Sequence, residues 1–124
     1  MEHHLSYDEQ NEIAVLVFKR NYNLADVKPI FESIKTMLED KPYRQAIVTI
    51  DESISQSFQV ENRETREATA TELSKSNLSN VAFVGGSAAI RMIAKVLLKT
   101  GIIKINGDFF KTMGDATDWL KSKR

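Results

Sequence analysis

Hydrophobic residues along this chain fall into short continuous runs and into stripes with helical spacing. The runs are Ile13–Phe18 (IAVLVF), 46–50 (AIVTI), 81–84 (VAFV) and 102–105 (IIKI). Short apolar runs rich in β-branched residues are typical of strands covered on both faces of a parallel sheet. The stretch HLSYDEQNE before the first run alternates weakly and turns at Gln10-Asn11. It predicts an edge strand joined to Ile13–Phe18 by a hairpin.

The clearest helical stripe follows the first run and predicts a helix that ends before Pro42. Its apolar residues recur at i, i+3, i+7, i+10 and i+14, as Leu24, Val27, Phe31, Ile34 and Leu38. Because proline is costly inside a helix, we place Asp26 at the N-cap and Pro29 in the first turn.

Three more helices are predicted further along the chain. The helix over 62–75 has Asn62 as its N-cap and a stripe poor in hydrophobic residues, made of Thr65, Ala68, Thr69 and Leu73. The next, over 87–99, is apolar on most of its surface. The last has Thr112 as N-cap and Asp115 at the N3 position. Its buried stripe is predicted to be Met113, Ala116 and Leu120.

The order of elements is therefore β-β-α-β-α-β-α-β-α, which defines an α/β fold. Strands that alternate with helices predict a mixed, mostly parallel sheet of four to five strands with right-handed crossovers and about four helices. The 124 residues contain no repeat or linker, so we expect residues 1–124 to form a single domain.

Composition excludes several classes of function. Lys plus Arg and Asp plus Glu are both 17, and this balance argues against a nucleic-acid-binding protein. Without cysteine there is no disulfide, thiolate nucleophile or cysteine-based zinc site. The apolar runs are far too short for a transmembrane segment, and the start of the chain lacks a signal-peptide pattern. We expect a cytoplasmic location.

No motif in the sequence predicts catalysis or a cofactor. Gly85 and Gly86 follow a strand and precede a helix, but neither a P-loop nor a dinucleotide fingerprint surrounds them, so we interpret them as a tight turn. His3 and His4 lack a third metal ligand, and we expect them to be frayed. Asp51 and Glu52 end a parallel strand without a histidine or lysine nearby in sequence. We expect no metal, no cofactor and no enzymatic activity.

Surface residues offer candidates for contact with a partner. Arg91, Lys95 and Lys99 form a basic stripe, which we interpret as a solvated face, with an acidic partner or a lipid headgroup as the functional alternative. Ser57 and Thr65 are hydroxyls near the start of a helix, where added negative charge is favourable. They are candidate phosphorylation sites, and Arg63 and Arg66 on the same helix are candidate contacts.

Several stretches together resemble the STAS domain and its SpoIIAA-like relatives, the STAS/SEC14 group. They are IVTID, ETRE, VAFV followed by AAIRMIAKVLLK, and ATDWL. The resemblance covers nearly the whole chain and implies a SpoIIAA-like fold without catalytic machinery. In the sigma-regulating branch, it implies partner binding controlled by a phosphorylated serine in a D-S-S-G-like motif. That motif is absent here, and Asn62 at the N-cap cannot be phosphorylated.

The favoured hypothesis is therefore a non-enzymatic regulatory or protein-interaction module that uses helix 62–75 and the loop before it. The alternative is a small-ligand or lipid-binding domain of SEC14-like type, with the ligand between helix 87–99 and a neighbour. SEC14-like domains are much longer, so we expect a core of this size to be filled by its own side chains. An edge of so small a sheet could also pair in a homodimer.

Overall fold

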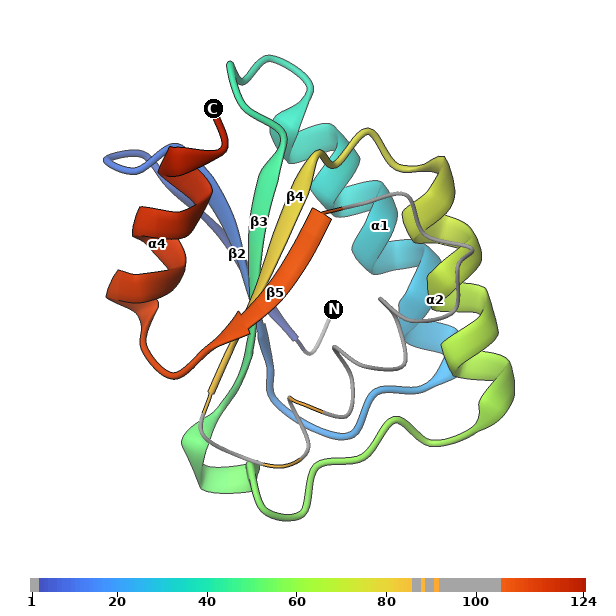
Figure 1. Ribbon diagram of the computed structural model, residues 1–124. Coiled ribbons are helices and arrows are strands. Elements are labelled where there is room, and N and C mark those ends of the chain that lie inside the picture. Colours follow the sequence, from blue (N-terminus) through green and yellow to red (C-terminus); the bar gives the residue numbers. More distant parts are fainter. Residues whose placement is uncertain (1–2, 86–87, 89–90, 92–105) are drawn as a thin grey trace.

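Five strands form one sheet in the order in which they occur along the chain (Figure 1). The computed structural model describes residues 3–85, 88, 91 and 106–124. The strands are β1 (His4–Asp8), β2 (Ile13–Phe18), β3 (Gln45–Ile50), β4 (Asn80–Val84) and β5 (Asn106–Phe110). The pair β1–β2 is antiparallel and the other three pairs are parallel. The sheet is thus mixed and mostly parallel, as predicted.

Helices lie on both faces of this sheet. Helices α1 (Leu24–Leu38) and α2 (Arg63–Lys75) cover one face, and α4 (Met113–Ser122) lies against the other (Figure 1). α1 and α2 each connect a strand to the next parallel strand in the same direction across the sheet. Right-handed crossovers of this kind put both helices on one side.

The core consists of two clusters, one on each face of the sheet. The cluster beneath α1 and α2 includes Leu16, Ala46 and Phe83, and the smaller cluster beneath α4 includes Ile13 and Ile47. Alternate residues of the central strands β2, β3 and β4 therefore point into different clusters. This two-sided burial explains why the strands appear in the sequence as continuous apolar runs.

The N-cap of helix α1 lies three residues before the predicted position, Asp26. Its N-cap is Asn23, and Asp26 occupies position N3, where its carboxylate accepts a hydrogen bond from the Asn23 amide at 2.9 Å. The N-cap prediction was wrong because an acidic residue is favoured at both positions. Pro29 lies inside the helix, where it leaves the carbonyl of the exposed residue Ala25 without its usual donor.

The buried stripe of α1 also differs in part from the prediction. Ile30 is 1% exposed, while Phe31 is only partly buried and Leu24 is 46% exposed. The other two helix starts are confirmed. The Asn62 side chain accepts from the Thr65 amide at 2.8 Å, and the Thr112 hydroxyl accepts from the Asp115 amide at 3.2 Å.

Met113 does not belong to the buried stripe of α4, since it is 42% exposed. Side chains in a helix tilt toward its N-terminus, so a residue in the first turn projects past the elements that cover later turns. Ala116 and Leu120 are fully buried, as predicted, and Trp119 packs on Phe110 with ring centroids 5.4 Å apart.

The predicted helix 87–99 and strand 102–105 lie outside the described residues. The strand β5 begins at Asn106, in a stretch for which no strand was predicted. Gly85 follows β4 with a φ of 150°, which favours glycine, and its amide donates to the Phe110 carbonyl at 2.9 Å. This amide links β4 to β5 and is not directed at an anion.

Candidate functional site

A cavity of about 330 Å³ lies between α1, α2 and the central strands. Its walls are built from the same face of the sheet that α1 and α2 cover. Residues from β2, β3 and β4 form one side, among them Leu16, Val48 and Phe83, and Ile30 and Ile34 of α1 form another. The expectation of a completely filled core is therefore not met by the described residues.

The poor hydrophobic stripe of α2 lines the third side of this cavity. Leu73 is its large apolar residue there, and the other α2 residues that line the cavity are Thr69 and Arg66. Small or polar side chains fill less of the space between a helix and a sheet than leucine or phenylalanine would. The composition of α2 thus explains why space remains at this position.

Two hydroxyl groups in the cavity wall are hydrogen-bonded to the protein. The Thr69 hydroxyl donates to the Thr65 carbonyl at 2.7 Å, and the Tyr22 hydroxyl lies 2.9 Å from the Thr69 oxygen. Because Thr69 has a single proton, Tyr22 must be the donor in the second bond. Burial raises the pKa of Tyr22 to about 12, so its hydroxyl stays neutral.

Arg66 differs from these hydroxyls because its guanidinium has no partner among the described residues. It is half-buried and is the one charged side chain among the described residues that line the cavity. Its backbone amide donates to the Asn62 carbonyl, as expected within the first turn of a helix. Arg63, three residues earlier, is exposed and pairs with the Glu67 carboxylate at 2.9 Å.

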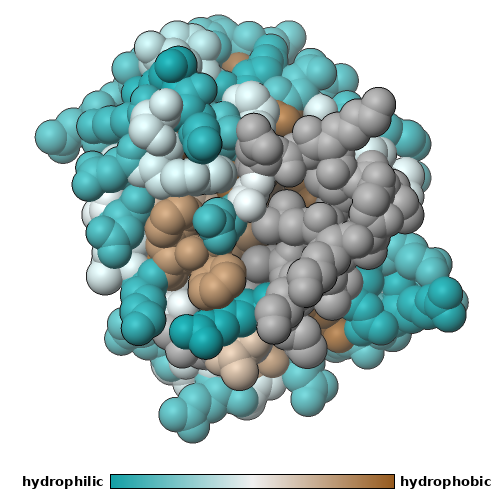
Figure 2. Space-filling view, viewed as in Figure 1, coloured by the Kyte–Doolittle hydropathy of each residue, from teal (hydrophilic) through white to brown (hydrophobic). Residues whose placement is uncertain are grey.

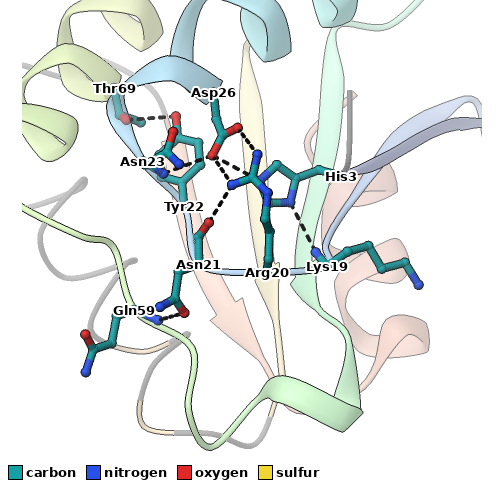
Figure 3. Close-up of polar contacts among 9 residues, drawn as sticks. All are labelled: His3, Lys19, Arg20, Asn21, Tyr22, Asn23, Asp26, Gln59 and Thr69. Carbon is teal, nitrogen blue, oxygen red and sulfur yellow. Dashed lines mark hydrogen bonds and ion pairs between the residues drawn. The ribbon is translucent and has the colours of Figure 1, made fainter.

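A buried polar cluster adjoins the cavity (Figure 3). The His3 side chain is 0% exposed, and its ring lies 5.2 Å from the ring of Phe18 and 6.3 Å from that of Tyr22, centroid to centroid. Phe18 and Tyr22 both line the cavity. The expectation of a frayed His3 was wrong, because this residue is buried beside the rings of Phe18 and Tyr22 and contacts Asp26 of α1.

Hydrogen bonds hold His3 in one orientation. The Lys19 amide donates to Nδ1 at 3.1 Å, so this nitrogen carries no proton, and Nε2 lies 3.2 Å from an Asp26 carboxylate oxygen (Figure 3). Arg20 also binds Asp26, through two bonds of 2.9 and 2.6 Å. His4 is exposed, but it is the first residue of β1 and pairs with Val17, so it is not frayed either.

Asp26 keeps its charge although it is buried. Burial by itself would raise the pKa of Asp26, but hydrogen bonds from Arg20, the Asn23 amide and His3 outweigh it and lower this pKa to about 2. The cluster therefore fixes the start of α1 to the end of β2 with an ionised carboxylate at its centre.

The carboxyl ends of β3 and β4 form a second hollow, which contains Asp51 and Glu52. The Asp51 carboxylate binds the Lys19 ammonium at 2.7 Å and accepts from the Ser53 amide and hydroxyl at 3.0 and 2.8 Å. Hydrogen bonding to Lys19, followed by that to Ser53, lowers the pKa of Asp51. A carboxylate held in this way caps the short 3₁₀ turn Glu52–Ile54 and is a weak base.

The structure separates the residues that the sequence grouped together. Ser57 is exposed, and its hydroxyl donates to the Ile54 carbonyl at 3.2 Å. Thr65 is 0% exposed, and its hydroxyl donates to the Asn62 side chain at 2.9 Å. A kinase would therefore reach Ser57 directly, whereas Thr65 would first have to leave the folded helix start.

Of the predicted basic stripe, Arg91 alone is described; Lys95 and Lys99 lie outside the described residues. The Arg91 guanidinium lies 5.3 Å from the centroid of the Phe109 ring, and Phe109 is 38% exposed. The face seen in Figure 2 is mostly hydrophilic, with hydrophobic surface over β5 beside the residues drawn in grey. A cation over an aromatic face is a favourable contact that occupies Arg91.

Among residues 3–85, 88, 91 and 106–124, no three acidic or histidine side chains come together as a metal site would require. In the same part of the chain, no helix combines the length and hydrophobicity needed to cross a bilayer. The prediction that the runs are too short to span a membrane is consistent with this finding.

The architecture and the two-sided core define an α/β domain of SpoIIAA-like fold. The structure is similar to a solved structure of a protein of the DUF3478 family from Shewanella loihica PV-4, described as having a SpoIIAA-like fold. The TM-score is 0.63, the sequence identity is 13%, and the match covers 95% of this chain and 91% of that one. No protein-family model and no curated protein matches the sequence. The fold that the sequence resemblance implied is confirmed.

Proposed function

We propose that this protein is a non-enzymatic domain that binds a small apolar molecule between α1, α2 and the sheet. The observation that carries this proposal is the cavity of about 330 Å³, whose walls are mostly aliphatic and aromatic. Sites for small ligands are typically concave, mostly apolar and furnished with a few polar groups. This cavity agrees with all three features.

The size of the cavity defines the size of its occupant. At roughly 30 Å³ for each water-sized group, the volume accommodates on the order of ten carbon atoms. An apolar chain of that length would leave water for a hydrophobic environment, which is favourable by about 25 cal/mol for each Å² buried. Water itself is a poor occupant, because an apolar cavity offers it few partners.

The polar groups of the cavity support binding without catalysis. The hydroxyls of Tyr22 and Thr69 are engaged with each other and with the backbone, and no carboxylate or imidazole is among the described residues that line the cavity. A nucleophile needs a nearby base, and a general acid or base needs a group that can exchange protons near neutral pH.

Filling the cavity tests the proposal directly. Val48 of β3 lines the cavity, and Val15 of β2 packs in the smaller cluster on the opposite face; both are half-buried. We expect Val48→Phe to abolish binding and Val15→Phe, the matched control, to preserve it. The measurement is native mass spectrometry of each protein purified from cells, followed by solvent extraction and by titration of stripped protein with decanoate and decan-1-ol.

The expected result is a bound apolar species in the wild type and in Val15→Phe, and its loss in Val48→Phe. Failure of both probes to bind the wild type, together with a ligand-free mass from cells, would overturn the proposal. Equal binding to Val48→Phe and the wild type would show that the ligand sits elsewhere.

The regulatory or protein-interaction role favoured by the sequence stays a prediction. Its surface would include the exposed Ser57 and Arg63, while Arg66 belongs to the cavity wall. In a pull-down with a protein partner, charge reversal at Arg63 should therefore weaken binding more than charge reversal at Arg66. The predicted cytoplasmic location and homodimer also stay predictions.

A further inference from the structure

We propose that the occupant of the cavity is a monocarboxylic acid with an apolar chain, whose carboxylate binds the guanidinium of Arg66. This inference rests on the proposed ligand-binding function and adds the chemical class of the ligand. The cavity holds the apolar chain of the ligand, and Arg66 binds its carboxylate.

The argument begins with the state of Arg66. Its side chain is half-buried beside a mostly apolar space, and it makes no hydrogen bond or ion pair with any described residue. Partial removal of a charge from water is costly unless an opposite charge or hydrogen-bond acceptors replace the water. The described residues provide no such group, whereas an anionic ligand would.

Other arginines in the molecule show what a partnered guanidinium looks like. Arg20 binds both carboxylate oxygens of Asp26, and Arg63 binds Glu67. Arg66 lies one helical turn from Arg63 on the same helix but faces the cavity, where no acidic residue is among the described lining residues. Its expected partner is thus a carboxylate that the described lining residues do not supply.

The nearby hydroxyls do not compete for this role. Thr69 donates its proton to the Thr65 carbonyl, and Tyr22 donates its proton to Thr69. Neither hydroxyl therefore has a proton left for an anion. Arg66 is the remaining polar donor among the described lining residues, and it fixes which end of an amphiphilic ligand lies at α2.

The charge balance favours a carboxylate over a phosphate monoester. One guanidinium offers a planar pair of donors that matches the two oxygens of a carboxylate, and it neutralises one negative charge. A phosphate monoester carries close to two charges near neutral pH. No second cation is among the described residues that line the cavity.

Three probes with the same chain separate these possibilities, namely decanoate, decan-1-ol and decyl phosphate. Each is titrated by calorimetry into stripped wild-type protein, Arg66→Gln and Arg63→Gln. A hydrogen-bonded charge pair of this kind corresponds to about a tenfold to hundredfold change in affinity. We expect the wild type and the control Arg63→Gln to bind decanoate at least about tenfold more tightly than decan-1-ol.

In Arg66→Gln, we expect the affinity for decanoate to fall to that for decan-1-ol, while the affinity for decan-1-ol stays within about threefold of the wild type. Arg66→Lys keeps the charge and should retain part of the preference for decanoate. Circular dichroism and thermal melting verify that each variant folds. If Arg66→Gln does not fold, the comparison of the probes in the wild type and in Arg66→Lys still decides whether Arg66 binds the carboxylate.

Two results would overturn the inference and leave the proposed function intact. One is equal affinity of the wild type for decanoate and decan-1-ol, and the other is an unchanged preference in Arg66→Gln. Tighter binding of decyl phosphate than of decanoate would overturn the carboxylate assignment. Failure of all three probes to bind would also overturn the inference, and a ligand-free mass of protein from cells in addition would overturn the proposed function as well.

Discussion

At the scale of single residues, two carboxylates differ in their exposure to water, Asp26 in its buried cluster and Asp51 in its pair with Lys19. The Asp26 side chain is 7% exposed and is held by Arg20, His3 and the helix start. The side chains of Lys19 and Asp51 are 45% and 30% exposed. Water screens an exposed ion pair, so we expect the buried cluster to dominate the electrostatic stability of the domain.

We predict that Asp26 makes the protein sensitive to acid. Its pKa in the folded state is about 2, below that of an unfolded aspartate, so its contribution is complete above about pH 4 and is lost as the pH falls toward 2. The lowering corresponds to about 2 kcal/mol of stability. In Asp26→Asn, the free energy of unfolding at pH 7 should fall by at least about 2 kcal/mol, because Arg20 and His3 lose the ionised carboxylate that they contact.

Urea denaturation between pH 7 and pH 2 measures both effects. The matched control is Asp51→Asn, which removes a carboxylate that is more exposed to water and should cost less stability at pH 7 than Asp26→Asn does. Similar losses in the two variants would contradict the assignment of the stabilising role to the buried cluster.

At the scale of elements, the features that depend on local sequence patterns were predicted well, and those that depend on long-range contacts were not. The strand runs matched three strands to within one residue at their N-terminal ends, and the caps Asn62 and Thr112 were correct, because both features depend on neighbours in sequence. The position of Asp26 was wrong because N-cap and N3 share a preference for acidic residues.

The site was harder to predict because distant segments create it. His3 meets Asp26 across 23 positions, and no local pattern indicates that an N-terminal histidine will be buried. One sequence feature is related to the cavity, namely the poor hydrophobic stripe of α2. Helix 62–75 was interpreted as a contact surface for a partner, whereas in the structure its residues Thr69 and Arg66 line the cavity.

We predict that α2 depends strongly on its N-cap. The helix buries few large side chains, with Leu73 as its main apolar anchor, so its first turn relies on the bond from the Thr65 amide to Asn62. Asn62→Ala should reduce the free energy of unfolding by about 1 kcal/mol. Asn77→Ala, which changes an exposed asparagine after the helix, should have an effect within about 0.5 kcal/mol.

Chemical denaturation of both variants measures this difference. Since Arg66 directly follows Thr65 in the first turn that this bond holds, Asn62→Ala should also weaken decanoate binding. A fully stable Asn62→Ala protein would indicate that packing, rather than the cap, fixes the start of α2.

At the scale of the whole molecule, a ligand in the cavity would join the two helices to the sheet. α1, α2 and strands β2 to β4 all contribute to the cavity wall, and the polar cluster of His3 and Asp26 adjoins it through Phe18 and Tyr22. A molecule bound there contacts most of the larger core cluster. Its binding energy therefore adds to the stability of the folded state.

We predict that decanoate raises the melting temperature of the wild-type protein. At a free concentration 100 times the dissociation constant, the stabilisation is about 2.7 kcal/mol, which corresponds to a shift of about 10 °C for a domain of this size. Differential scanning calorimetry at increasing decanoate concentration measures the shift. Val15→Phe should show it as well, and Val48→Phe should not. A shift of equal size in Val48→Phe would point to nonspecific binding of the amphiphile.

The order of the strands has a consequence for how the molecule is made. β1 to β5 follow one another across the sheet as they do along the chain. None of these five described strands has to be inserted between two that are already paired, so each one can add to the free edge left by its predecessor. The sheet can thus grow from one side while the chain leaves the ribosome, and each partly made domain presents a single growing edge to its surroundings.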